Sequence, residues 1–252
     1  MRPRTRTAPV LPLRGPLVEA RFLERPNRFI VHARLANGRR AVAHLADPGR
    51  LVELLVPGRR LWLRPAADPL RKTRWSAALV ESPDASALVS VDTALPNRLI
   101  ARALETEVLD ELRGWRLEKR EHTIGPSRFD FLLHRRRGGP GPRRMALEVK
   151  SVTLVENRVG LFPDAVTARG TRHVRELTTL HRSGEWATAV LFVLQRPDAD
   201  RIMPDAAIDP DFAGAVADAR RAGVRLLGRR CLVDLEGVTL GPAVPVRVPR
   251  SR

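Results

Sequence analysis

The chain has 252 residues and is 43% hydrophobic, enough to fill one large or two modest domain cores and too much for wholesale disorder. No apolar run approaches the roughly 18–20 residues of a membrane span, and the basic residues 1–16 lack the apolar stretch of a secretory signal. The single cysteine, Cys231, excludes an internal disulfide, and no Cys/His cluster suggests structural zinc, so we expect a cytoplasmic protein.

Positive charge dominates the composition. The chain has 45 Lys and Arg against 28 Asp and Glu, a net charge of +17, which favours a polyanionic partner such as a nucleic acid. A compositional bias toward Arg explains Arg in place of Lys but not the excess of basic over acidic side chains. Residues 1–90 hold 17 basic and 7 acidic side chains (net +10), and residues 91–252 hold 28 and 21 (net +7), so we expect the first third to make the main electrostatic contact.

The first third of the chain reads as an arm followed by short strands. Residues 1–16 are rich in Arg and Pro and predict a mobile arm. Alternating patterns predict strands at 17–24, 28–35, 39–45, 60–64, 75–81 and 88–91, with a hairpin turn at Asn37-Gly38. So many short strands predict a small closed barrel over 17–92, with an OB-fold as the natural candidate and an SH3-like barrel as the alternative.

From about residue 93 the pattern changes to that of an α/β domain, which we expect to extend to residue 252. Apolar residues at helical spacing predict helices over 96–112, 169–182 and 210–222. The predicted strands are 115–120, 128–134, 145–152, 187–194 and 224–228, and a Gly/Pro/Arg loop occupies 135–144. The continuous apolar run 187–194 is typical of a strand buried on both faces, so a mixed central sheet is expected.

Two acidic residues and a lysine lie on neighbouring predicted strands: Asp130, and then Glu148 and Lys150. Because side chains alternate along a strand, Glu148 and Lys150 share one face, Val149 turns to the core, and Asp130 can meet them from the next strand. Two carboxylates suit Mg²⁺ or Mn²⁺, which can polarise a phosphodiester and lower the pKa of a bound water. Lys150 can orient that water or stabilise developing charge. A cluster that only neutralises itself has the same pattern, so both interpretations stay open.

Several basic side chains are candidates for contact with phosphate. They are Arg50, Arg71, Lys72, Arg74, Arg169 and His173. Each has a structural alternative: a turn for Arg50, a solvated loop for the residues at 71–74, and a solvated helix face for Arg169 and His173, which share it with Glu176. The candidates from the helix can also position water near the active site.

Two further features have more than one interpretation. Aromatic residues beside arginines in the predicted barrel suit stacking on single-stranded bases, although for each one a place in the barrel core is the better prediction. These aromatics are Phe22, Phe29, Trp62 and Trp75. Asp164, in F-P-D-A, is either a further metal or substrate contact or a turn residue that caps the next segment.

Several motifs resemble those of the sugar fermentation stimulation protein A family. They are E-V-K-S-V-T-L-V-E-N from residue 148, F-P-D-A-V-T-x-R-G-x-x-H-V-x-E-L from 162, N-R-L at 97, S-R-F-D-F at 127 and H-L-A-D-P-G-R-L at 44. The resemblance extends from about 17 to 245. It implies an N-terminal OB-like domain joined to a PD-(D/E)-x-K, restriction-endonuclease-like domain that binds DNA.

By the same resemblance, Asp130, Glu148 and Lys150 occupy the catalytic positions, and Glu107 is an extra acidic residue near the metal. The chain departs from the family at 46–49, where A-D-P-G replaces Pro-Asn-x-Gly, so Asp47 inherits no role. The loop at 135–144 is a local elaboration.

These observations predict a DNA-binding protein with a nuclease site that depends on Mg²⁺ or Mn²⁺. The alternative is a regulator of sugar (maltose) metabolism genes that binds DNA without cutting it, although no helix-turn-helix signature is present. A basic scaffold on ribosomal RNA leaves the D…E-x-K arrangement unexplained. RNA is not excluded as a partner, no membrane is expected, and a homodimer is left open because many nucleases of this design cut as dimers.

Overall fold

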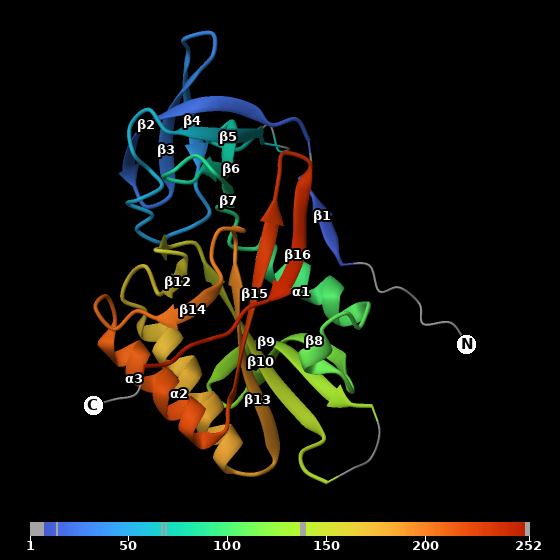
Figure 1. Cartoon of the computed structure of the whole chain (residues 1–252). Helices are drawn as coiled ribbons and strands as arrows, with labels where there is room; N and C mark the ends of the chain where they lie inside the picture. The colour runs from blue at the N-terminus through green and yellow to red at the C-terminus, as the bar shows by residue number, and fades with distance from the viewer. Residues whose placement is uncertain (1–7, 14, 67, 69, 137–139, 250–252) are drawn as a thin grey trace.

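The chain forms two domains stacked end to end, a barrel and a larger α/β domain (Figure 1). This computed structural model describes residues 8–13, 15–66, 68, 70–136 and 140–249. None of the described helices is long and apolar enough to cross a membrane. The predicted combination of an OB domain with an α/β domain that has a mixed sheet is confirmed.

The first domain has a six-stranded sheet, five strands of which form the barrel. The six are β2 (Val18–Asn27), β3 (Ile30–Leu35), β4 (Arg40–His44), β5 (Arg60–Pro65), β6 (Trp75–Glu81) and β7 (Leu88–Ser90). In the order β4-β3-β2-β5-β6-β7, a parallel pairing of β4 with β6 closes the first five strands into the barrel, and β7 is added beside β6. Alternate side chains such as Phe22, Val31 and Ala43 fill the interior, as a closed barrel requires.

The second domain is built on a seven-stranded mixed sheet in the order β1-β16-β15-β13-β10-β9-β8. Its strands are β1 (Val10–Pro12), β8 (Trp115–Ile124), β9 (Ser127–Arg135), β10 (Arg144–Val152), β13 (Trp186–Leu194), β15 (Arg225–Val233) and β16 (Gly237–Ala243). The β10–β13 and β13–β15 pairs are parallel and the others antiparallel. A small sheet beside it comprises β11 (Val155–Glu156), β12 (Val159–Phe162) and β14 (Arg201–Pro204).

Helices cover both faces of the large sheet. On one face α1 (Leu95–Glu105) packs on Leu147, Val149 and Leu191, and a 3₁₀ turn, η1 (Asp110–Leu112), follows it. On the other face α2 (Ala168–Arg182) and α3 (Pro210–Ala222) lie side by side (Figure 1) over a core that includes Val190 and Phe192. The predicted helix 96–112 therefore ends early, at Glu105.

The sequence predictions for the arm and for several strands need correction. Residues 1–7 and 14 lie outside the described residues, but Val10–Pro12 is strand β1 and pairs with β16, so this part of the predicted arm belongs to the sheet. Strands β11, β12, β14 and β16 were not predicted. The elaborated loop at 135–144 is described only in part, because residues 137–139 lie outside the described residues.

Candidate active site

The predicted cluster of two acids and a lysine forms where strands β9 and β10 separate. The two strands pair from Arg144 with His134 down to Leu147 with Phe131, and the ladder stops one residue before Asp130 and Glu148. Val149 turns to the core beneath α1, as its place between Glu148 and Lys150 predicts. The sheet edge thus presents Asp130, Glu148 and Lys150 together.

Asp130 occupies an irregular position in β9. Phe129 and Phe131 pack in cores on opposite faces of the sheet, although residues two apart in a regular strand face the same side. The distortion lets the Asp130 carboxylate take the place of a backbone acceptor: the Val149 N–H donates to Oδ2 at 2.7 Å. The amide Nδ2 of Asn97 on α1 donates to Oδ1 at 2.6 Å. Asp130 is therefore fixed from both sides.

Glu148 points toward the opposite helix layer and is buried, with 5% of its surface exposed. Its Oε1 accepts hydrogen bonds from Lys150 Nζ and His173 Nδ1, each at 2.7 Å. Because an ionised carboxylate only accepts, His173 must donate through Nδ1. The second oxygen, Oε2, is buried without a hydrogen-bond partner among the described residues. A buried acceptor without a partner is costly, and marks a position where a ligand can bind.

The pKa values of the two carboxylates, Asp130 and Glu148, are shifted in opposite directions. Burial, and next the nearby Glu148 carboxylate, raise the pKa of Asp130 to about 6. Burial would also raise the pKa of Glu148, but the His173 hydrogen bond and the Lys150 charge outweigh it and lower that pKa below its usual value. Glu148 therefore stays ionised while Asp130 titrates close to neutral pH. Separated pKa values in paired acids are typical of catalytic sites.

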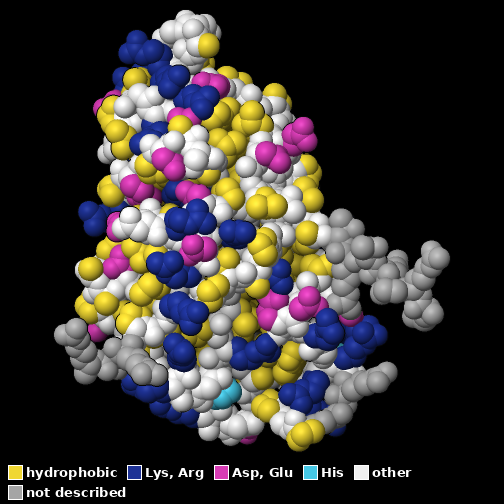
Figure 2. Space-filling view, viewed as in Figure 1, with side chains coloured by type: hydrophobic (Ala, Val, Ile, Leu, Met, Phe, Trp, Pro, Cys, Tyr) yellow, Lys and Arg dark blue, Asp and Glu magenta, His cyan; other side chains and the backbone are white. Residues whose placement is uncertain are grey.

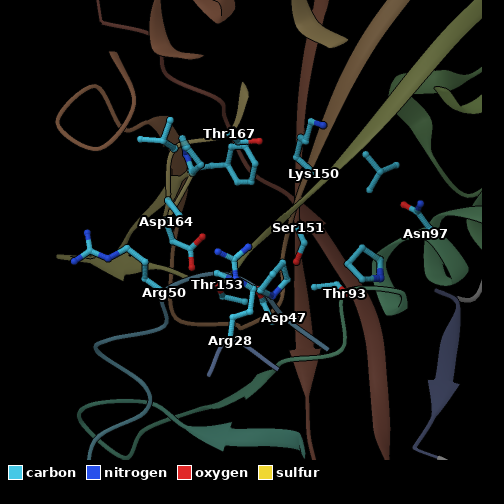
Figure 3. A pocket seen from close by; sticks show the side chains of 18 of the residues that line it. Arg28, Asp47, Arg50, Thr93, Asn97, Lys150, Ser151, Thr153, Asp164 and Thr167 are labelled. Carbon is cyan, nitrogen blue, oxygen red and sulfur yellow. The ribbon is translucent and has the colours of Figure 1, made fainter. Parts of the chain in front are cut away.

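The cluster opens into a cavity of about 760 Å³ between the two domains (Figure 3). Asn97, Val149 and Lys150 line it on the side of the α/β domain, together with Thr167. Arg28 and Arg50 line it on the side of the barrel. A phosphate group can therefore reach Lys150 from solvent, whereas Asp130 and Glu148 are not among the residues that line the cavity.

A half-buried arginine, Arg25, holds together the barrel wall of this cavity. Arg25 donates from Nη1 to the carbonyls of Gly49 (2.7 Å) and Arg50 (2.8 Å), and from Nη2 to those of Arg28 (2.8 Å) and Asp47 (3.1 Å). Asp47 Oδ1 in turn accepts from the Gly49 N–H at 2.8 Å. No sequence pattern distinguishes Arg25, because the chain contains many arginines and this one belongs to no motif.

Asp164 connects the two domains across this wall. Its carboxylate lies against Gly49, where an added Cβ would be 2.7 Å from Asp164 Cγ. Burial raises the pKa of Asp164, against the lowering effect of the Leu51 and Arg50 backbone N–H groups and of Arg25. Burial, and the Asp164 charge, also raise the pKa of Asp47 to about 6. Asp164 therefore contacts the other domain, a role that neither sequence interpretation included.

The structure separates the other predicted site residues. Glu107 does not join the cluster, because Arg116 and Arg136 hold its two carboxylate oxygens at 3.0 and 3.2 Å. It also follows the far end of α1, ten residues beyond Asn97 and so about 15 Å along the helix direction. His173 is 3% exposed, so it cannot contact phosphate; it contacts Glu148 instead.

The remaining predicted phosphate contacts divide by position. Arg50 lines the cavity. Arg71, Lys72 and Arg74 lie in the β5–β6 loop, which does not line it, and Arg71 is bound to Ser76 and Thr73. Arg169 is exposed in the first turn of α2. Positive charge is nonetheless widespread: Figure 2 shows Lys and Arg side chains over both domains on one face, with Asp and Glu between them.

The donor set at the cluster fits a hard divalent cation. Asp130 and Glu148 supply carboxylate oxygens, and the unpartnered Glu148 Oε2 is a free acceptor in a buried position. Mg²⁺ is commonly held by one or two carboxylates and keeps several waters, so two protein ligands are sufficient. Among the described residues no group of three or more His, Cys, Asp and Glu side chains forms a fuller cage.

Comparisons with known proteins match both domains. The model described as "SfsA N-terminal OB domain" matches residues 23–91, and the one described as "Sugar fermentation stimulation protein RE domain" matches residues 94–237. A sugar fermentation stimulation protein homolog from Shouchella clausii is 46% identical over 234 residues, covering 92% of this chain and 98% of its own. The homolog from Moorella thermoacetica is also 46% identical, covering 92% and 96%.

A solved structure shows the same arrangement of domains. It is entitled "The structure of Pyrococcus Furiosus SfsA in complex with Ca2+" and superimposes with a TM-score of 0.82 at 30% identity. The match covers 94% of this chain and 100% of that one, so the similarity extends over both domains.

Proposed function

This chain belongs to the sugar fermentation stimulation protein family, and from that premise and the site geometry we propose that it is a metal-dependent nuclease acting on DNA. One observation carries the proposal. Asp130, Glu148 and Lys150 lie together where strands β9 and β10 separate, Lys150 lines the interdomain cavity, and the buried Glu148 Oε2 has no hydrogen-bond partner among the described residues. The calcium complex of the Pyrococcus furiosus relative supports a divalent ion, because Ca²⁺ prefers the same oxygen ligands.

Asp130 and Glu148 would hold the ion, which when bound would polarise a phosphodiester and acidify an attacking water. Lys150 stabilises the negative charge that develops on the phosphate oxygens, from a site where low dielectric strengthens its effect. Asn97 and His173 keep the two carboxylates in place, and each comes from a helix on a different face of the sheet. Partners of this kind commonly alter metal affinity or activity by about 10–100-fold.

One specific observation favours the alternative, DNA binding without cleavage. Both oxygens of Asp130 already accept hydrogen bonds, and Lys150 is paired with Glu148, so the cluster satisfies much of its own polarity. The family name, linked to sugar fermentation, agrees equally with a regulator. In that case the barrel and the arginines of the cavity would do the binding, and the acids would be structural.

A nuclease assay with added Mg²⁺ or Mn²⁺ on single- and double-stranded DNA and RNA distinguishes the two. We expect cleavage by the wild type and a loss of at least about 100-fold in Asp130→Asn and Lys150→Ala. Glu121→Gln is the matched control, because Glu121 is an exposed carboxylate on β8 paired only with Arg128. Equal residual cleavage in all proteins excludes this site, and salt-dependent binding without cleavage in either metal supports the regulator.

A further inference from the structure

The cavity between the domains has a barrel-side lip that the proposed chemistry does not use. It is the β2–β3 turn, in which Asn27 and Arg28 line the cavity and Phe29 follows them. Phe29 is 47% exposed, whereas Phe22 and Trp62 are 2% and 6% exposed and Trp75 is half-buried. A large ring left in water directly after the cavity-lining Arg28 is not explained by packing of the barrel.

Hydrogen bonds hold the backbone of the turn, so the positions from which its side chains project are fixed before any ligand arrives. Asn27 Oδ1 accepts from the Phe29 N–H at 2.9 Å, and the Phe29 carbonyl accepts from the Leu45 N–H at 2.8 Å. The Arg28 carbonyl accepts from Arg25, the same guanidinium that holds the Arg50 carbonyl. Arg25 thus ties together the two segments that carry Arg28 and Arg50.

Two arginines on this wall are exposed and make no ion pair. They are Arg28 and Arg50, neither of which has an ion-pair partner within the described part of the chain, unlike Arg40, which pairs with Glu24. The Asp47 and Asp164 carboxylates line the same cavity, and Figure 3 shows Arg28 beside Asp47 and Arg50 on the far side of Asp164, with its side chain extending away from Lys150. Exposed guanidinium groups without an ion pair can bind the phosphates of a nucleic-acid backbone.

Apolar surface accompanies these charges on both lips. Phe29 stands on the barrel side, and Val166, which lines the cavity from the other domain, is 75% exposed. Bases offer flat apolar faces beside a charged backbone, and aromatic side chains next to cations bind them when they are unstacked. The volume of about 760 Å³ is in the range of small-ligand pockets, so it accommodates a nucleotide or two.

We propose that the β2–β3 turn is a clamp for single-stranded nucleic acid, in which Phe29 stacks on a base and Arg28 and Arg50 hold the adjacent phosphates. The inference rests on the proposed function for the position of the scissile phosphate, near Lys150. It adds the substrate class: an unpaired strand, or an end frayed by one or two nucleotides, enters between the domains. Duplex contacts only the outer surface.

The test measures binding without cleavage, by fluorescence anisotropy of labelled DNA about 20 nucleotides long, single-stranded or duplex, in EDTA. Wild type is expected to bind the single strand more tightly. Phe29→Leu should weaken single-strand binding by about 5- to 150-fold, the range of one lost base stack, and leave duplex binding unchanged. Phe29→Trp should retain it. Leu235→Ala, at an apolar side chain 50% exposed in the β15–β16 turn, is the matched control.

The arginines are tested through the salt dependence of the same binding. Arg28→Gln and Arg50→Gln should each reduce the slope of log affinity against log salt by about 0.7, the value for one phosphate contact on a single strand. Arg39→Gln, in the turn at the opposite end of β3, roughly 17 Å away, removes the same charge without the contact. It should therefore leave the slope unchanged.

Unchanged single-strand affinity in Phe29→Leu, or duplex bound by the wild type as tightly as single strand, overturns the clamp. Equal slopes in Arg28→Gln and Arg39→Gln overturn the assignment of the phosphates. These outcomes are separate from the nuclease proposal. If Phe29→Leu weakens single-strand binding but no metal-dependent cleavage is found, the clamp is supported and the nuclease proposal is wrong. If cleavage is lost in Lys150→Ala but neither cleavage nor binding changes in Phe29→Leu, the nuclease is supported and the clamp is wrong.

Discussion

The contact between Gly49 and Asp164 gives a sharp prediction about how the two domains fit together. Gly49→Ala would place a Cβ 2.7 Å from Asp164 Cγ and closer still to its Oδ2, well inside ordinary van der Waals contact. The Gly49 backbone cannot move away easily, because its carbonyl accepts a hydrogen bond from Arg25 and its N–H donates one to Asp47. Overpacking of this kind typically costs about 1–3 kcal/mol. For a chain of this size that corresponds to a fall in Tm of about 2–12 °C.

Thermal unfolding of single and double variants measures the contact directly. Asp164→Ala removes the atoms that clash, so the double variant should be more stable than the sum of the two single effects by about 1 kcal/mol or more. Gly214→Ala is the control, because a Cβ there meets nothing within 4 Å and the helix α3 gains about 0.5–1 kcal/mol from the change. An unchanged Tm in Gly49→Ala, or strictly additive effects, would refute the reasoning.

Three further predictions concern the site and the sheet. Because burial raises the pKa of Asp130 to about 6, ionised Asp130 costs folding stability above that pH, and the cost fades as the pH falls toward 4. Asp130→Asn should therefore increase the free energy of unfolding of the metal-free protein, relative to wild type, by up to about 3 kcal/mol at pH near 7.5 and by much less at pH near 4. Thermal unfolding at the two pH values measures this as a difference in Tm, and a pH-independent difference contradicts it. His173→Ala should reduce metal-dependent cleavage about 10–100-fold with unchanged DNA affinity in EDTA, since His173 touches Glu148 and not solvent; weaker binding would place His173 on the DNA. Leu11→Asp should loosen β1 from β16, lower stability by about 1–2 kcal/mol in urea unfolding and promote aggregation seen by light scattering; a monodisperse variant of full stability would show that β1 is dispensable.

Three residues of the candidate site could be predicted from the sequence because they are close together along the chain. Asp130, Glu148 and Lys150 lie on two strands joined by one loop, and strand alternation places the side chains with little further information. The helix layers and the barrel followed from periodicity for the same reason. Where the prediction failed locally, at the end of α1, the chain has a positive φ of 54° at Glu107, which no hydrophobic pattern reveals.

The partners of these residues could not be predicted because they come from distant parts of the chain. The sequence predicts His173 as a phosphate contact or as part of a solvated helix face, and only the packing of α2 on the sheet shows that its side chain is buried on Glu148. Asn97 reaches Asp130 from the other face, 33 residues earlier. The cavity itself is formed by two domains, so no pattern within either domain indicates that Arg25 and Asp164 meet.

The pairing of β1 with β16 affects how the protein is made. Residues 10–12 leave the ribosome about 225 residues before their partners at 237–239. At about 5–20 residues per second, this strand waits roughly 10–45 s for its neighbour. The barrel strands between them have all their partners within residues 18–90 and can fold during that interval. The OB domain can therefore fold first during synthesis, and β1 joins the sheet of the second domain only after β16 has been made.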